Sequence, residues 1–376
     1  MALAAAAAVG GIFARNFMGI NKRIIALDVT RITALFGVIL LHTLLDFTLR
    51  ADFFRTPVWF LLEPIIVLSR TGVLLFFFIS GYLVVEKNRS LGDNWRKLIR
   101  RIGIPLLTFQ ILLLIYRYFA FSTTNLHTFF LREVLRMTTF LNSHLWFLEV
   151  LFVLYLFNPV WQLIFAPRNK RLAQYITGIA FLFSLVTTAV STFLSFDAFT
   201  VFTAWTGFVW IYLYGALVKR KWAPQVRLPV WAGVLFFSVC MGILGDYVGR
   251  LSMAHGVISN FSIYTMNYLS LNGAFAALAI FHILLKVEYK KYLQVLPQKI
   301  GYRILEKMAE LSFGIYLIHP FVIGLLTDGI GFRFDNSEMN LYLYILIFVS
   351  AVLGTSILLT MGIKRLPILK QSIGFW

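Results

Sequence analysis

Long apolar segments recur along the chain, separated by short clusters of polar and basic residues. The segments are continuous and lack the alternation over about 10 residues that marks a membrane β-strand, so they predict helices. Each is close to the ~20 residues that a helix needs to cross a bilayer. In hydrocarbon every backbone N–H and C=O must be paired within its segment, which again requires helices. The pattern predicts about ten spans, near 26–49, 66–86, 99–121, 144–166, 173–194, 199–218, 229–248, 264–286, 308–327 and 341–363.

The stretch 57–69 stands just before the second span and contains Pro57, Glu63 and Pro64. It is too short to cross a bilayer alone. We therefore interpret it as an interfacial or half-buried helix that leads into the second span.

Composition supports a membrane class. Of the 376 residues 60% are apolar and 13% are charged, about half of the ~25% charged residues in a typical soluble domain. Mean hydropathy is +0.81. The chain has one cysteine, Cys240, so it cannot form an intramolecular disulfide, and no Cys-rich metal motif is present. The predicted fold class is an all-α, polytopic integral membrane protein without a bound metal.

The net charge of +18 comes from basic clusters between the apolar segments. Such clusters follow the positive-inside rule, so we do not expect nucleic acid as a partner. With the N-terminus in the cytoplasm, the inner side holds 25 of the 34 Lys and Arg residues and the outer side holds 7. This asymmetry predicts two cytoplasmic termini and a location in the bacterial cytoplasmic (inner) membrane.

The domain organisation is simple. Residues 1–23 are expected to be a disordered tail. The Ala-rich start lacks the basic n-region of a signal peptide, so we do not expect a cleaved one. Residues 24–365 form one transmembrane domain, and 366–376 a short cytoplasmic tail. Nothing in the sequence sets the oligomeric state.

The first span carries the sharpest set of ionisable residues, and such residues are costly inside a membrane. Arg31 and His42 are eleven residues apart, which places them on one helix face, separated by ~16 Å along the axis. Asp46 follows one turn later on the same stripe. Taken singly, Arg31 could interact with lipid phosphates, His42 could bond a neighbouring helix, and Asp46 could mark the helix end. Together they favour a site for a ligand with an anionic head.

Three further features lie near the second span and the basic segment that follows it. Ser80, Gly81 and Tyr82 interrupt an apolar run with two hydroxyls and a position open to close approach, which fits either a ligand or a packed helix. Arg70 is expected at the outer end of the span, as a substrate contact or an interfacial residue. The pair Arg100–Arg101 fits either an ordinary cytoplasmic cluster or a landing site for a nucleotide.

The fourth and ninth spans add polar residues. His144 and Trp146 are expected at the outer interface, and Glu149 about one turn inside it. Tyr316 and His319 fall near mid-membrane. We assign His144, Trp146, Tyr316 and His319 to substrate binding, although a histidine bonded within the bundle is equally compatible with these positions.

Five segments in order, LDVTRITALFGVILLH, FFFISGYL, RKLIRRIGIP, HLWFL and SFGIYLIHP, resemble the membrane acyltransferase 3 family. The short, single-domain form is similar to bacterial inner-membrane O-acetyltransferases that modify surface glycans such as the enterobacterial common antigen. The resemblance implies acetyl-CoA as acyl donor and a hydroxyl of a glycan or a lipid-linked oligosaccharide as acceptor. It also implies that Arg31 and His42 are essential and that Ser80, Gly81 and Tyr82 belong to the donor site.

The residues themselves suggest His42 as the general base, near neutral pH, with Asp46 orienting its ring and Glu149 as a further acid of the site. Arg31, Arg100 and Arg101 would bind the nucleotide head of the donor. Direct transfer and an acyl-enzyme both remain open. A rival prediction is a transporter or flippase for a lipid-linked sugar, although no inverted repeat with paired broken helices is visible. A non-catalytic membrane sensor is a third.

Overall fold

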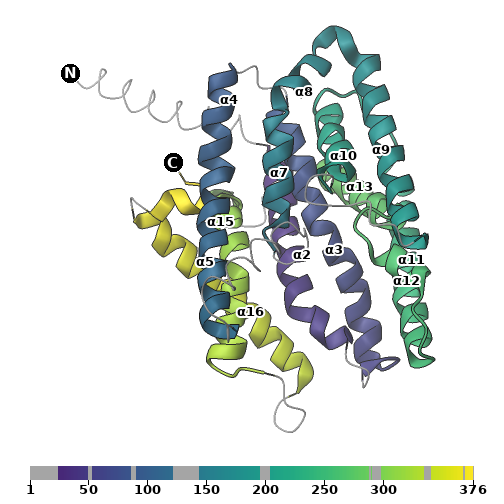
Figure 1. The fold of residues 1–376 in the computed structure, drawn as a ribbon, viewed down its shortest axis with the longest axis vertical. Helices are drawn as coiled ribbons and strands as arrows, with labels where there is room; N and C mark the ends of the chain where they lie inside the picture. The colour runs from purple at the N-terminus through teal and green to yellow at the C-terminus, as the bar shows by residue number, and fades with distance from the viewer. Residues whose placement is uncertain are drawn as a thin grey trace.

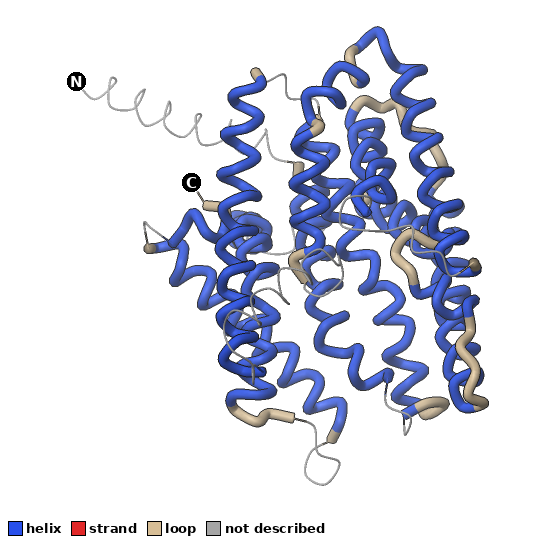
Figure 2. The backbone as a smooth tube through the Cα atoms, in the orientation of Figure 1, coloured by secondary structure: helices blue, strands red, loops and turns tan. Residues whose placement is uncertain are grey.

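The structure is a computed structural model, and every regular element in the part of the chain that it describes is helical (Figure 2). The N-terminal tail 1–23 lies outside the described residues. The described residues are 24–49, 53–85, 90–121, 144–194, 204–287, 289, 298–333, 340–366 and 369–375.

The helices form one bundle, with α2, α3 and α7 in its middle (Figure 1). On one side lie α5, α15 and α16, and on the other α9 and α11. The longer helices are α2 (Ile25–Leu49), α3 (Pro57–Val84), α5 (Ile104–Phe121), α7 (Trp146–Leu156), α9 (Lys170–Phe193), α10 (Ala204–Lys219), α11 (Leu228–Ala254), α13 (Leu271–Lys286), α15 (Gln298–Gly324) and α16 (Leu341–Arg365). The shorter ones are α4 (Leu91–Leu98), α8 (Asn158–Ile164), α12 (Asn260–Met266), the π-helices η2 (Ile99–Gly103) and η4 (Leu325–Gly329), and the 3₁₀ helices η3 (Pro167–Asn169) and η5 (Leu369–Ile373).

Eight helical segments of the described chain are long and apolar enough to cross a membrane. A ninth is possible if α7 and α8, which meet at an angle of 55°, form one broken span. Helix α10 has only 16 residues among those described. The all-helical, multi-pass class is thereby confirmed, whereas the number of ten and the cytoplasmic side of the termini stay predictions.

The sequence suggested that the stretch 57–69 is a separate interfacial or half-buried helix, and this prediction was wrong. It forms the first half of α3, one helix of 28 residues that continues through Pro64. Thr56 caps its start by accepting a hydrogen bond from the Trp59 amide, and Pro57 occupies the first turn, where its missing N–H costs nothing. Glu63 is consequently 1% exposed inside the bundle.

Helix α3 is central because its backbone comes very close to both α2 and α10. A Cβ on Gly72 would stand 2.6 Å from the Ala34 carbonyl oxygen of α2. A Cβ on Gly81 would stand 1.7 Å from the Tyr212 carbonyl oxygen of α10. From the other side, a Cβ on Gly215 would stand 2.1 Å from the Phe78 oxygen. Small residues at such crossings allow membrane helices to pack by van der Waals contact.

Replacing Gly81 with Ala should therefore destabilise the bundle. The added methyl overlaps a backbone atom that cannot rotate away, and overpacking of this kind costs about 1–3 kcal/mol. The measurement is the thermal unfolding temperature of the detergent-purified protein, which should fall by several degrees. Gly178→Ala is the matched control, since nothing lies within 4 Å of its Cβ position. Equal melting temperatures for the two variants would contradict the packing role.

Candidate functional site

Three histidines from separate segments come together beside α3. The ring of His42, from α2, lies 5.3 Å from the ring of His319 in α15, measured between centroids. The ring of His144, which directly precedes α7, lies 5.9 Å from His319 on another side. His319 is fully buried, His144 is half-buried and His42 is exposed. The cluster therefore has one exposed, one half-buried and one fully buried imidazole.

The hydrogen bond of His319 fixes the form of its ring. Nδ1 lies 2.6 Å from the Tyr316 carbonyl oxygen, and a carbonyl can only accept, so Nδ1 carries the hydrogen. In the neutral ring Nε2 is then an acceptor. It is buried and has no hydrogen-bond partner among the described residues. This nitrogen is available to a donor that is not part of the described protein, such as a hydroxyl or a water.

Tyr316 connects two of the histidine-bearing segments. It is 2% exposed, and its hydroxyl donates a hydrogen bond to the His144 carbonyl oxygen. Its ring packs against Phe147 of α7 and Phe76 of α3, with centroid distances of 5.5 and 6.1 Å. Tyr316 thus holds the start of α7 against α15, which is a positioning role rather than the substrate contact expected from sequence alone.

Helix α2 carries two of the candidate residues, Arg31 and His42. His42 faces α15, and Arg31 lies three turns earlier on the same helix. Arg31 pairs with Asp28, with 3.2 Å between Nη1 and Oδ1, and its side chain is 28% exposed. The backbone of Asp46 continues α2, but its side chain lies outside what the structure describes.

Glu149 has a defined partner on a neighbouring helix. Nε2 of Gln110 in α5 donates a hydrogen bond of 2.7 Å to Oε1 of Glu149 in α7. The bond leaves the other carboxyl oxygen of Glu149 for a further contact. Glu149 stands in the first turn of α7, five residues after His144.

The residues expected at the donor site divide into two groups. Gly81 faces the α10 backbone, so a packing role explains it, while Ser80 and Tyr82 are half-buried and Nζ of Lys219 lies 4.9 Å from the Tyr82 ring centre. Arg100 and Arg101 are exposed in the π-helix η2. Single π-turns inside α-helices are frequent at functional sites.

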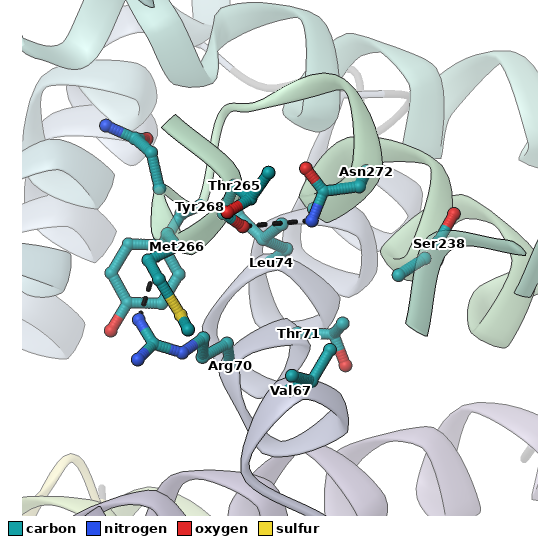
Figure 3. Close-up of a pocket in the computed structure, with 12 residues that line it drawn as sticks. Val67, Arg70, Thr71, Leu74, Ser238, Thr265, Met266, Tyr268 and Asn272 are labelled. Atoms are coloured by element: carbon teal, nitrogen blue, oxygen red, sulfur yellow. Dashed lines mark hydrogen bonds between the residues drawn. The ribbon is translucent and has the colours of Figure 1, made fainter. Parts of the chain in front are cut away.

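Arg70 lies in the middle of α3 and not at a span end, because α3 begins at Pro57. Its Nη1 donates a 2.9 Å hydrogen bond to the Met266 carbonyl oxygen, at the break between α12 and α13. It lines a small pocket together with Tyr268 and Asn272 (Figure 3). The Tyr268 ring lies 5.7 Å from that of Trp146. Tyr268 therefore stands between the pocket of Arg70 and Trp146.

Sequence reasoning missed a charged network on the α11 side of α3. Asp246 accepts a hydrogen bond from Trp59 Nε1 at 3.1 Å and pairs with Nε of Arg250 at 2.5 Å. Both charged side chains are largely buried, and Glu63 interacts with each of them. The signal was the Asp–Arg spacing of four residues, which places the pair on one helix face, but the predicted span 229–248 ended before Arg250.

Within the described ranges, no three His, Cys, Asp or Glu side chains are arranged to hold a metal ion. A family model described as an acyltransferase domain, of the acyltransferase 3 type, matches residues 24–360. No curated protein and no solved structure shows significant similarity to the chain.

Tyr316→Phe should loosen the start of α7. The change removes only the hydroxyl that bonds the His144 carbonyl, at a cost of about 1 kcal/mol. Hydrogen–deuterium exchange of the first turn of α7 should become faster while the overall helix content is unchanged. The control is Tyr342→Phe, at an exposed position. Unchanged exchange at α7 would show that the hydroxyl does not hold this segment.

Proposed function

Because the chain belongs to the acyltransferase 3 family, we propose that it is an O-acetyltransferase. It transfers an acetyl group from cytoplasmic acetyl-CoA to a hydroxyl of a cell-surface polysaccharide or its lipid-linked precursor. The family supports a multi-pass membrane acyltransferase in general. The observation that carries the finer proposal is the meeting of His42, His144 and His319, of which His42 is exposed and His319 fully buried.

The donor binds from the cytoplasmic side of an inner membrane. Its phosphates are recognised by guanidinium groups, which form charge-assisted hydrogen bonds with phosphate oxygens. Arg31, Arg100 and Arg101 are the candidates, with Arg31 already oriented by Asp28. The ~16 Å between Arg31 and His42 along α2 suits an extended arm that carries the thioester to the imidazole. Ser80 and Tyr82 are further candidate donor contacts.

His42 acts as the general base. It takes the proton from the acceptor hydroxyl, whose oxygen forms a bond to the thioester carbonyl carbon. The carbon–sulfur bond breaks, the ester remains on the sugar, and the proton passes from the imidazole to the departing thiolate. An imidazole can both accept and return a proton, so one side chain serves both proton transfers.

The surrounding residues orient the acceptor and the base. Asp46, one helical turn after His42, would hold the imidazole tautomer. The free acceptor nitrogen of His319 suits a sugar hydroxyl. Glu149 would accept from a second hydroxyl while Gln110 keeps its carboxylate in place, and Trp146 would supply an aromatic wall. Transfer through a transient acyl-imidazole is an alternative route with the same residues.

The family match favours this enzyme over a flippase for a lipid-linked sugar. The two are separated by incubating the purified protein with labelled acetyl-CoA and envelope membranes from cells that lack it. Release of CoA with label in the glycan supports the acyltransferase. Movement of the glycan lipid between leaflets without use of acetyl-CoA would overturn it.

His42→Ala should lower acetyl transfer by at least about 100-fold, the usual contribution of a general base. Transfer is measured as labelled acetyl in the glycan fraction. His255→Ala serves as the control, since His255 is an exposed residue at the end of α11. Transfer by the His42 variant at the rate of the control would rule out the catalytic assignment.

Arg31→Gln should raise the KM for acetyl-CoA about tenfold and change kcat much less, because a charge-assisted bond to the donor phosphates is lost while the reacting atoms are untouched. Arg168→Gln, an exposed change in η3, is the control. A fall in kcat at constant KM would instead place Arg31 in the chemical step.

A further inference from the structure

A large apolar groove runs between α11, α12 and α13. Its volume is about 440 Å³, and its walls include Phe237, Met241, Phe261 and Phe275. Phe237 is 65% exposed, and α11 is mostly unburied along its length. In a membrane-spanning helix such a face meets lipid, so the groove is open to an apolar chain from the bilayer.

The groove continues into the small pocket that Arg70 lines. Ser238, Thr265 and Asn272 line both the groove and the pocket. The pocket is narrow, with room for about one water molecule. Figure 3 shows Arg70 extending from α3 toward the α12–α13 break, beside the Tyr268 ring.

Arg70 is the one charged residue that lines the described pocket. Nη1 is engaged by the Met266 carbonyl, while Nε is buried and has no hydrogen-bond partner among the described residues. A buried guanidinium N–H without a partner is costly. An oxygen of an anionic group, entering in place of water, would satisfy it.

The pocket also adjoins the histidine cluster. The Tyr268 ring lies 5.7 Å from Trp146, and Trp146 stands two residues after His144. An amphiphile with its chain in the groove and its anionic group at Arg70 would therefore present the next part of its head toward Trp146 and the imidazoles.

We propose that this groove and pocket bind the acceptor in its lipid-linked form, with a polyprenyl chain between α11 and α13 and one oxygen of its first phosphate reaching Arg70. The sugar then extends past Trp146 to His42. The proposal rests on the proposed function for the identity of the sugar acceptor, and it commits to a lipid-linked glycan rather than a finished polysaccharide. A single groove that ends at a single guanidinium fits one chain with one anionic head.

The test uses the full-length protein in vesicles of phosphatidylethanolamine and phosphatidylglycerol, with a photoactivatable polyprenyl phosphate as probe. Cross-links should fall in residues 228–275 and be displaced by unlabelled polyprenyl phosphate. Gly233→Leu fills the groove wall and should reduce labelling about tenfold. Gly178→Leu, at an equally exposed helix position with open space, should not. Equal labelling of the two variants would overturn the proposal.

A second pair of probes examines the head group. Polyprenyl phosphate should label the protein about tenfold more strongly than the uncharged polyprenol, and Arg70→Gln should abolish that difference. If the difference between the two probes persists in Arg70→Gln, the phosphate does not bind at Arg70. Because labelling needs no acetyl-CoA, its failure leaves acetyl transfer to the glycan untouched. Successful labelling without acetyl transfer would refute the enzyme and retain the lipid site.

Discussion

The close backbone contact of α3 with α2 and α10 is the constraint on which the arrangement depends. Lipid tails are as apolar as leucine, so helices in a membrane gain little from hiding apolar side chains and associate through close packing instead. Gly72 brings α3 against α2, and Gly81 brings it against α10. Any side chain at these two positions would separate the helices, so the glycines set both the spacing and the rotation of α2.

The rotation of α2 in turn decides where its histidine lies. With its Ala34 side against α3, α2 presents His42 to α15. The same α3 then fixes the other two histidine-bearing segments through aromatic contacts, with Phe77 against Phe147 at 4.7 Å and Phe76 against Tyr316 at 6.1 Å. The imidazoles meet because α2 packs on both α3 and α15, and rings of α3 contact α7 and α15, although no two of the three histidine-bearing segments are neighbours in sequence.

This dependence explains what could be predicted from the sequence. Helix type and most bounds follow from apolar periodicity, and α2 and α16 were predicted to within two residues. The continuity of α3 was missed because Glu63 and Pro64 both argue against a membrane interior, and only tertiary partners such as Asp246 and Arg250 make Glu63 tolerable there. Those partners are about 180 residues away in the chain, beyond the reach of any local pattern.

The site was predicted as a set of residues but not as a geometry. Helix spacing gave the shared face of Arg31 and His42, because that relation is internal to one helix. The contact of His42 with His319 depends on how α2 and α15 cross, which the spacing of neither helix contains. Gly81 shows the same limit: its motif fitted either a ligand or a packed helix, and only the structure identifies its neighbour as the backbone of α10.

Helix α3 also separates the two proposed approaches to the imidazoles. Gly72 faces α2, and Arg70, two residues earlier, lies about 200° away around the helix, toward the α12–α13 break. A donor that follows α2 and an acceptor that enters between α11 and α13 would thus reach the cluster from opposite sides of one helix. Neither substrate would need to leave before the other arrives, so a membrane protein with no separate soluble domain in its described residues could bring together a cytoplasmic thioester and a lipid-borne hydroxyl.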